Sequence, residues 1–223
     1  NIRDFLTSGS PTAKTNLENL FDDTLAYDTT VNCILLGSLK SNSYVGTGLN
    51  EFKSLLPKLK NTQVYEEALA ASGQLCWGVL DSNPVMVRLV SDLATNTPLG
   101  IFAVVYNDTR INELMNVATN KETAENRPYS ILVKLDGEIL ASPHPEQIGT
   151  KVTALLATNK VNTILEQSQN QSGHFTTKLA KKNTLVTYNF LRAKGWYLFG
   201  FAQNDYLFRE INRRGAFNLI TIV

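Results

Sequence analysis

Apolar residues recur at helical spacing near the start of the chain. Four of them between Asn16 and Tyr27 share the spacing of one helix face: Leu17, Leu20, Phe21 and Leu25. This pattern predicts an amphipathic helix. A strand-like run from Val31 to Leu36 follows, and then a stretch rich in Ser, Asn and Gly from Ser41 to Asn50 that is typical of a loop.

A short amphipathic segment precedes a series of strands. Apolar side chains mark it around Phe52 and Leu55, and Pro57 predicts its end. Three apolar runs come next, separated by short polar connections that contain proline: Leu75–Leu80, Val85–Val90 and Leu99–Tyr106. Short strands joined in this way predict antiparallel neighbours. A helix follows them, with Asn107 or Asp108 available as its N-cap.

The pattern restarts after a polar segment from Ala118 to Pro128, which we interpret as the connection between two modules. Two strands, Tyr129–Leu135 and Glu138–Ala141, are joined by Asp136-Gly137, a strong hairpin signal. The remaining pattern predicts a helix, three strands and a last helix: Val152–Leu165, Phe175–Leu179, Leu185–Phe190, Trp196–Phe201 and Asp205–Arg213. Lys182-Asn183 is the expected turn between the first two of these strands.

An internal repeat relates the two halves of the chain. A shift from residue 99 to residue 196 lays Leu99–Leu114 on Trp196–Ile211 and places Phe102 on Phe199. In both segments a buried strand runs directly into a capped amphipathic helix. The identities are few, but the shared order of elements predicts two related modules of the α+β class.

Composition supports a packed protein without a nucleic-acid partner. The 223 residues are 43% hydrophobic and 18% charged, which is ample for a core and exceeds one typical domain. The 21 basic and 20 acidic residues give a net charge of +1. This balance provides no electrostatic footprint for nucleic acid or for an anionic membrane surface.

Motifs for catalysis, metals and cofactors are missing from the sequence. The two histidines, His144 and His174, stand apart, and no metalloprotease, nucleophile-elbow, kinase or phosphate-loop signature occurs. The Gly46-Thr47-Gly48 triplet lacks the third glycine of a dinucleotide loop. We therefore expect no enzyme activity and no cofactor in this chain.

The two cysteines leave two interpretations open. Cys33 and Cys76 both lie in apolar, strand-like runs. In an oxidising compartment they could form a disulfide between adjacent strands, and otherwise they would be buried free thiols that pack as small apolar side chains.

Both ends of the sequence suggest a piece of a larger protein. The chain begins at Asn1 without an initiator Met, which indicates processing or excision. Apolar residues become denser in Phe217–Val223. That segment fits either a C-terminal strand or the start of a transmembrane helix.

The second half resembles the membrane-proximal module of a double-Cache (PAS-like) region. Ile131–Pro143 with its Asp136-Gly137 turn, followed by Glu146–Val152, resembles the strand, turn and strand of that module. The closing strands and exit helix have similar counterparts in Thr184–Tyr188, Gly195–Leu198 and Tyr206–Ile211. In the first half, the strand around Trp77 and the strand Leu99–Val105 resemble the membrane-distal module. The resemblance covers nearly the whole chain.

This resemblance implies an architecture and a location. Two PAS-like modules with antiparallel sheets would stack along a long N-terminal helix. Residues 1–30 would lead from a first transmembrane helix, 31–118 would form the distal module, 119–213 the proximal module, and 214–223 the exit toward a second transmembrane helix. The region would lie outside the cell at its membrane, and the full-length receptor would be a homodimer.

The resemblance also implies a function in signalling. The chain would be the extracellular ligand-binding region of a membrane-bound two-component sensor histidine kinase. Alternatively it would belong to a chemoreceptor or a diguanylate cyclase, or be a free-standing extracellular binding protein. A relay requires that ligand affinity differ between two receptor states.

The ligand expected from the resemblance is not an amino acid. Family members that bind amino acids carry an Arg-x-Trp-Tyr element and a late aspartate in the distal sheet. Around Trp77, Leu75 and Gly78 stand at the Arg and Tyr positions, and Val105 replaces the aspartate. A buried charged ligand without these partners would be unfavourable.

Four residues remain as the predicted ligand-binding set: Tyr65, Trp77, Arg88 and Tyr106. They suit a neutral or polar small molecule, such as a sugar or a peptide. Each has a structural alternative, because Trp77 and Tyr106 could simply pack in the core and Arg88 could point to solvent on an alternating strand. Trp196 and Tyr197 are assigned to the core of the second module.

Overall fold

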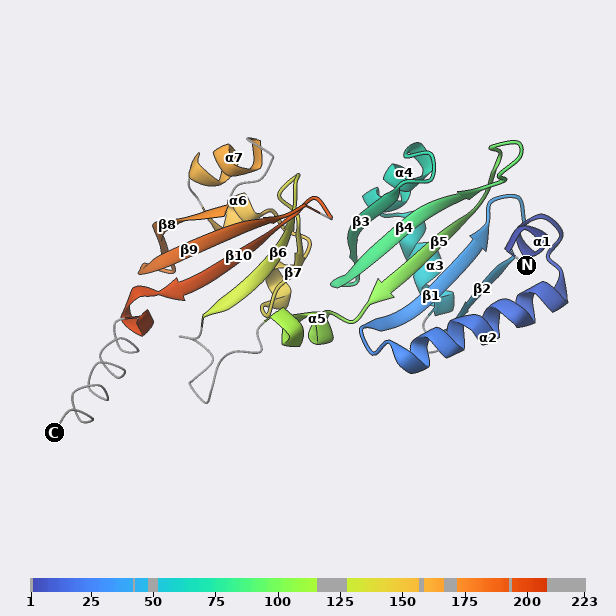
Figure 1. Ribbon diagram of the computed structural model, residues 1–223, viewed down its shortest axis with the longest axis horizontal. Coiled ribbons are helices and arrows are strands. Elements are labelled where there is room, and N and C mark those ends of the chain that lie inside the picture. Colours follow the sequence, from blue (N-terminus) through green and yellow to red (C-terminus); the bar gives the residue numbers. More distant parts are fainter. Residues whose placement is uncertain are drawn as a thin grey trace. The chain divides into compact units, whose positions relative to one another are not determined.

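The computed structural model describes residues 2–41, 43–47, 52–115, 128–156, 159–166, 172–192 and 194–207. The chain divides into two compact units, Asn1–Ile111 and Asn112–Val223 (Figure 1). Each unit contains a five-stranded antiparallel sheet with accompanying helices. The predicted α+β class and the antiparallel sheets are therefore confirmed. The predicted module boundary at 118/119 lies outside the described residues.

The N-terminal segment forms two helices where one long helix was predicted. Helix α1 spans Ile2–Ser8 and helix α2 spans Pro11–Tyr27. Between them, Gly9 adopts a φ of +66°, a left-handed conformation that glycine tolerates best. The Ser10 hydroxyl then accepts a hydrogen bond from the backbone N–H of Ala13 and caps α2. This stop and restart signal explains the interruption.

The first sheet has the strand order β2-β1-β5-β4-β3. These strands are β1 Val31–Ser38, β2 Tyr44–Thr47, β3 Leu75–Leu80, β4 Asn83–Ser91 and β5 Pro98–Tyr106. Strand β2 lies inside the stretch that was predicted to be a loop. Its pairing with β1, for example Leu35 opposite Gly46, overrides a composition that disfavours strands.

The β3–β4 hairpin turns earlier than predicted. Asp81 and Ser82 both have positive φ, at 48° and 63°, and form a two-residue loop. Asn83 and Pro84 were expected in the turn, but both belong to β4 and pair with Leu80 and Val79. The primed turn matches the twist of the two strands, which fixes this register.

Helices cover the two faces of the first sheet. On one face, α3 (Phe52–Lys60) and α4 (Gln63–Ala70) pack against the sheet around buried Leu59, Ala68 and Val87. On the other face, α1 and α2 pack through Leu6 and Leu17. Helix α3 continues through Pro57, against the prediction. Burial of Leu55 and Leu59 on either side of the proline outweighs the backbone hydrogen bond that it removes.

The second unit repeats the topology of the first. Its sheet has the order β7-β6-β10-β9-β8, with the strands β6 Tyr129–Lys134, β7 Ile139–Ala141, β8 Ser172–Leu179, β9 Lys182–Leu191 and β10 Trp196–Gln203. Strands β5 and β10 therefore hold the same central place. Helix α5 (Asp108–Met115) follows β5, and residues 204–207 are helical after β10. The internal repeat is confirmed at the level of topology, while the rest of the predicted Asp205–Arg213 helix lies outside the described residues.

The helical segment of the second unit contains two helices where one was predicted. A 3₁₀ turn at Pro145–Gln147 is followed by α6 (Val152–Leu155) and α7 (Asn159–Glu166) in place of one helix. Tyr197 is fully buried beneath α7 and its hydroxyl donates a 3.0 Å hydrogen bond to the carbonyl of Ile164. Tyr197 thus belongs to the core, as expected.

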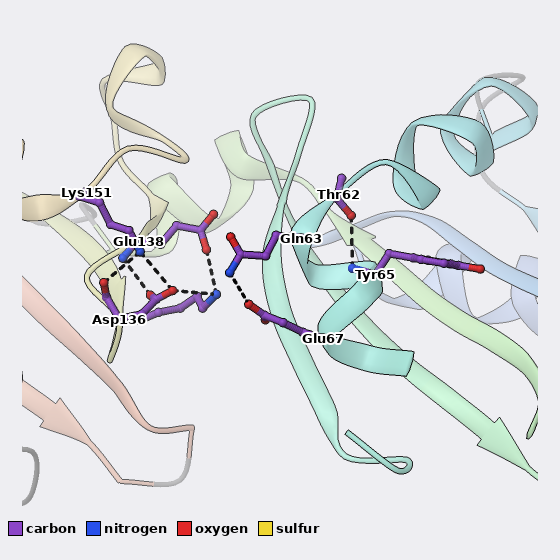
Figure 2. A network of polar contacts seen from close by, with 8 residues as sticks. Thr62, Gln63, Tyr65, Glu67, Asp136, Glu138 and Lys151 are labelled. Atoms are coloured by element: carbon purple, nitrogen blue, oxygen red, sulfur yellow. Dashed lines mark hydrogen bonds and ion pairs between the residues drawn. The ribbon is translucent and has the colours of Figure 1, made fainter. Parts of the chain in front are cut away.

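Two turns of the second unit show how local chemistry sets strand ends. The β8–β9 loop is Ala180-Lys181, with φ of 48° and 67°, so the predicted turn residues Lys182 and Asn183 lie within β9. The β6–β7 loop is stabilised by Asp136, whose carboxylate accepts a hydrogen bond from the N–H of Glu138 and contacts Lys151 (Figure 2).

Hydrogen bonding and charge together lower the pKa of Asp136. Burial acts to raise this pKa, but the Glu138 N–H and the lysines Lys134 and Lys151 outweigh it. Gly137 follows with a φ of +85°. The N–H of Lys134 donates a hydrogen bond to the carbonyl of Glu138, so the three residues between them form a hairpin loop that ends in a left-handed glycine.

A candidate ligand cavity in the first unit

A cavity of about 240 Å³ lies between the first sheet and the helices α3 and α4. Strands β1, β2 and β5, the turn between β1 and β2, and both helices contribute to its wall: Gly37, Ser38, Leu39, Ser41, Ser43, Tyr44, Leu56, Lys60, Tyr65 and Ile101. The wall combines apolar side chains with hydroxyl groups and one ammonium group. This mixture suits a small polar molecule with an apolar portion.

A glycine in the middle of one strand row makes this hollow. Gly37 pairs with Tyr44 on β2 and with Ile101 on β5, and side chains directly opposite one another share a face of the sheet. Gly37 therefore leaves a gap between the side chains of Tyr44 and Ile101. A Cβ added at Gly37 would meet Leu56 Cδ1 at 3.7 Å, so the gap opens toward α3.

Tyr65 is the largest buried polar side chain in the cavity wall. It lies on the first turn of α4, where the Thr62 hydroxyl caps the helix by accepting a hydrogen bond from the Tyr65 backbone N–H (Figure 2). The side chain is only 7% exposed. Burial, and then the charge of Glu66, raises the pKa of the Tyr65 phenol. The hydroxyl therefore stays protonated and can donate a hydrogen bond to a ligand.

The turn after β1 forms the rim of the cavity and is pinned by Ser38. Its hydroxyl accepts hydrogen bonds from the backbone N–H groups of Lys40 and Ser41, both at 3.2 Å. The same hydroxyl donates to the carbonyl of Leu6 on α1 at 2.9 Å. The rim is thus attached directly to the first helix of the chain.

Of the four predicted ligand-binding residues, the structure places only Tyr65 in this cavity. Trp77 and Tyr106 stack on each other, with ring centroids 5.5 Å apart. Both lie on the sheet face opposite the cavity, because the partner of Trp77 is Met86, which packs with α1 and α2 rather than with α3 and α4.

Arg88 is on that same opposite face. It pairs with Leu75 and Phe102 and is exposed to solvent. A ligand role for Trp77, Arg88 and Tyr106 would need a second site on this face, and it stays a prediction. Burial of the Tyr106 ring, and then the charge of Asp28, raises the pKa of its phenol.

The sequence analysis predicted Tyr65 and missed the other residues of the cavity wall, of which Gly37, Tyr44 and Lys60 are the most informative. The signal for one of them is present, since a lone glycine inside an apolar strand often marks space left for a close neighbour or a ligand. Tyr44 was hidden inside the segment that was predicted to be a loop. Lys60 follows Pro57, where the helix was expected to have ended.

Neither cysteine of the chain forms a disulfide. Cys33 on β1 is buried and Cys76 on β3 is half-buried. Strands β5 and β4 separate β1 from β3, so roughly 14 Å lies between the two strands at the usual strand spacing. A disulfide requires Cα atoms within about 7 Å. The two thiols therefore do not form the disulfide that the sequence left open.

Two further properties concern the described part of the chain only. No helix among these residues is long and apolar enough to cross a membrane. No cluster of His, Cys, Asp or Glu side chains within the same residues has the arrangement of a metal site.

Solved structures identify the fold. The periplasmic sensory domain of the Campylobacter jejuni chemoreceptor Tlp1 matches with a TM-score of 0.64 at 11% identity, covering 93% of this chain and 85% of that one. The ligand-binding domain of the Pseudomonas aeruginosa amino acid chemoreceptor PctB, bound to L-Arg, matches with a TM-score of 0.62 at 14% identity, over 92% and 83%.

The extracellular domain of a histidine kinase has the same fold. The extracellular domain of the predicted histidine kinase mmHK1S-Z3 matches with a TM-score of 0.61 at 11% identity, over 95% of this chain and 87% of that one. No protein-family model and no curated protein matches the sequence. The chain therefore has the double-Cache, PAS-like fold of bacterial sensory domains, as the sequence resemblance implied.

Proposed function

We propose that this chain is the extracytoplasmic ligand-binding region of a membrane-bound signal-transduction receptor. Two observations support this role. The fold is shared with sensory domains of two chemoreceptors and a histidine kinase. The first unit also contains a cavity that is lined by hydroxyl, aromatic and aliphatic groups. We propose no enzyme activity for this region.

The ligand is a polar small molecule that binds in the Gly37–Tyr65 cavity. The single observation that carries this assignment is the gap at Gly37, which opens a hollow beside the buried Tyr65 phenol. The residues that line the cavity include no carboxylate. The ammonium group of a free amino acid would have no acidic partner there, which favours a sugar or an organic acid.

Two output mechanisms fit the proposal. A two-component sensor histidine kinase is the first, and the extracellular domain of a histidine kinase among the solved structures supports it. A chemoreceptor is the second, supported by PctB and Tlp1. In either case the region would be flanked by transmembrane helices and would act as a homodimer. The sequence of the complete gene tests this point through its flanking apolar spans and its output domain.

A thermal-shift screen against sugars, peptides, amino acids and organic acids tests the binding role. A ligand that binds the folded state raises the melting temperature by mass action. Gly37→Val should abolish the shift, because the added side chain fills the gap between Tyr44 and Ile101. Gly37→Ala should weaken it less, since its Cβ makes only an ordinary contact with Leu56.

Matched variants locate the site. Tyr65→Phe should weaken binding by removing one hydroxyl, whereas Tyr27→Phe removes a hydroxyl from a side chain that is 90% exposed and should have no effect. A confirmed ligand whose affinity is unchanged in Gly37→Val and reduced in Trp77→Ala would move the site to the opposite face of the sheet. If no compound in the screen stabilises the protein, the proposed sensory role is contradicted.

A further inference from the structure

The mouth of the cavity widens into a second, more polar hollow. This outer hollow measures about 450 Å³ and shares most of its wall with the inner cavity: Ser38, Leu39, Lys40, Ser41, Lys60 and Tyr65. The inner cavity contributes the apolar side chains of Leu56 and Ile101. A ligand that spans both would place a polar group outside and a less polar group inside.

The outer hollow is positively charged. Lys40 and Lys60 both line it, and no acidic side chain does. Neither ammonium group forms an ion pair with any of the residues that the structure describes, whereas the neighbouring Lys58 pairs with Asp81. Two ammonium groups at one opening attract an anion, and they repel each other when the opening is empty.

Hydroxyl groups add hydrogen-bond donors to the same opening. The Tyr65 hydroxyl has no hydrogen-bond partner among the described residues and is protonated. Ser41 Oγ accepts a hydrogen bond from the N–H of Ser43 at 3.3 Å, so its own proton is still available. The Ser38 hydroxyl, in contrast, already donates to Leu6. Tyr65 and Ser41 are therefore the groups that can donate to an oxyanion.

We propose that the ligand carries an oxyanion, a carboxylate or a phosphate, which Lys40 and Lys60 bind at the mouth. This inference rests on the proposed function and specifies the ligand class of the same site. The uncharged part of the ligand lies in the inner cavity against Leu56 and Ile101. At about 240 Å³, the inner cavity is smaller than the pockets of about 300–1,000 Å³ that hold drug-sized ligands. The ligand is therefore a small organic acid or phosphate ester and not a long peptide.

Matched compounds test the charge requirement. L-Lactate, L-lactamide and L-alanine differ in whether they carry an anion alone, no charge, or an anion with an ammonium group. Glycerol 3-phosphate and glycerol, with glucuronate and glucose, separate phosphate and sugar acid from their neutral counterparts. Isothermal titration calorimetry should show binding for at least one anion and at least tenfold weaker binding for its neutral partner. Affinity should fall as the salt concentration rises.

Lysine variants test which groups bind the anion. Lys60→Gln should weaken anion binding about tenfold, and Lys40→Gln/Lys60→Gln should weaken it further, since hydrogen bonds to charged groups contribute most. Lys178→Gln is the control, because Lys178 is an exposed lysine of the second unit. It makes the same change in charge away from the cavity and should leave affinity unchanged.

The outcomes separate this inference from the proposed function. A neutral compound that binds as tightly as its anion, or an anion whose affinity survives Lys40→Gln/Lys60→Gln, overturns the oxyanion proposal. If that neutral compound no longer binds to the Gly37→Val variant, the cavity and the sensory role still stand. Binding of L-alanine in preference to L-lactate would likewise overturn it, because an ammonium group has no acidic partner in the wall. Failure of all three anions to bind would also count against it.

Discussion

The hydroxyl of Ser38 donates a hydrogen bond to the backbone carbonyl of Leu6, joining the rim of the cavity to helix α1 across 2.9 Å. The rim turn itself depends on the same hydroxyl, which accepts the N–H groups of Lys40 and Ser41. A ligand that orders this turn would therefore bias the position of α1. A ligand shifts a two-state receptor only if it binds one of the two states more tightly than the other.

Ser38→Ala should destabilise the protein by about 1 kcal/mol, because it removes the part-buried hydrogen bond to the Leu6 carbonyl together with two exposed hydrogen bonds from the N–H groups of Lys40 and Ser41. Urea unfolding followed by circular dichroism measures this change. Ser8→Ala is the matched control, since the Ser8 hydroxyl donates to the carbonyl of Asp4 on the exposed side of its own helix. Its expected cost is under about 0.5 kcal/mol. Equal effects of the two variants would contradict the pinning role of Ser38.

Gly100→Ala should disrupt the contact between α1 and the sheet. A Cβ at this position would lie 2.5 Å from the carbonyl oxygen of Gly37 and 2.6 Å from Leu6 Cδ2. The backbone oxygen cannot move aside easily, so overpacking should cost about 1–3 kcal/mol. Gly37→Ala is the control, because its Cβ has room. Thermal unfolding of the two variants should differ clearly, and similar melting temperatures would show that α1 can shift without cost.

The charge of Asp92 should make stability depend on acid pH. The N–H groups of Ala94 and Thr95, with a smaller contribution from Arg3, lower the pKa of this buried carboxyl despite the opposing effect of burial. Folding lowers the pKa of the Asp92 carboxyl. The charged carboxyl therefore stabilises the folded protein at pH values above the pKa that it has in the unfolded chain, which is about 3.9. That contribution is lost as pH falls through the lower, folded value.

Asp92→Asn retains an oxygen that can accept the two N–H groups but removes the charge that binds Arg3 at 2.8 Å. The variant should be less stable than the natural sequence at pH 7, and the difference should shrink as pH falls below 4. Urea unfolding at a series of pH values measures this convergence. A difference that stays constant down to pH 2 would contradict the assigned role of the charge.

The order of elements could be predicted from the sequence because periodicity and turn residues act locally. Asp136-Gly137, for example, specifies a hairpin through a left-handed glycine and through the Asp136 carboxylate, which accepts a hydrogen bond from the N–H of Glu138. Exact strand ends depend on strand pairing. The β8–β9 turn is therefore found at Ala180-Lys181 and not at the predicted Lys182-Asn183. Strand β2 formed against its composition because β1 supplied a partner.

The site was harder to predict, since a strand pattern does not reveal which face carries a cavity. Trp77 and Tyr65 are both aromatic side chains of the first unit, yet β3 places Trp77 on the α1–α2 face. The hollow arises from the missing side chain of Gly37, and its depth depends on the packing of α3, which is a tertiary property. The aromatic and polar character of Tyr65 was enough to predict its role. The residues beside it, such as Gly37 and Tyr44, are identified only by the register of the paired strands.

The thiols offer a final test of the strand order of the first sheet. Cys33 on β1 and Cys76 on β3 are separated by two strands, so they cannot be bridged without unfolding the sheet. The purified protein should therefore show two thiols in denaturant whether or not it was exposed to air, with an unchanged melting temperature under reducing conditions.

Without denaturant, Cys76 should react with a thiol reagent before Cys33, because Cys33 is only 4% exposed. Cys33→Ser, which places a hydroxyl among apolar neighbours, should destabilise the protein more than Cys76→Ser. An intramolecular disulfide in the folded protein would contradict the strand order β1-β5-β4-β3 itself.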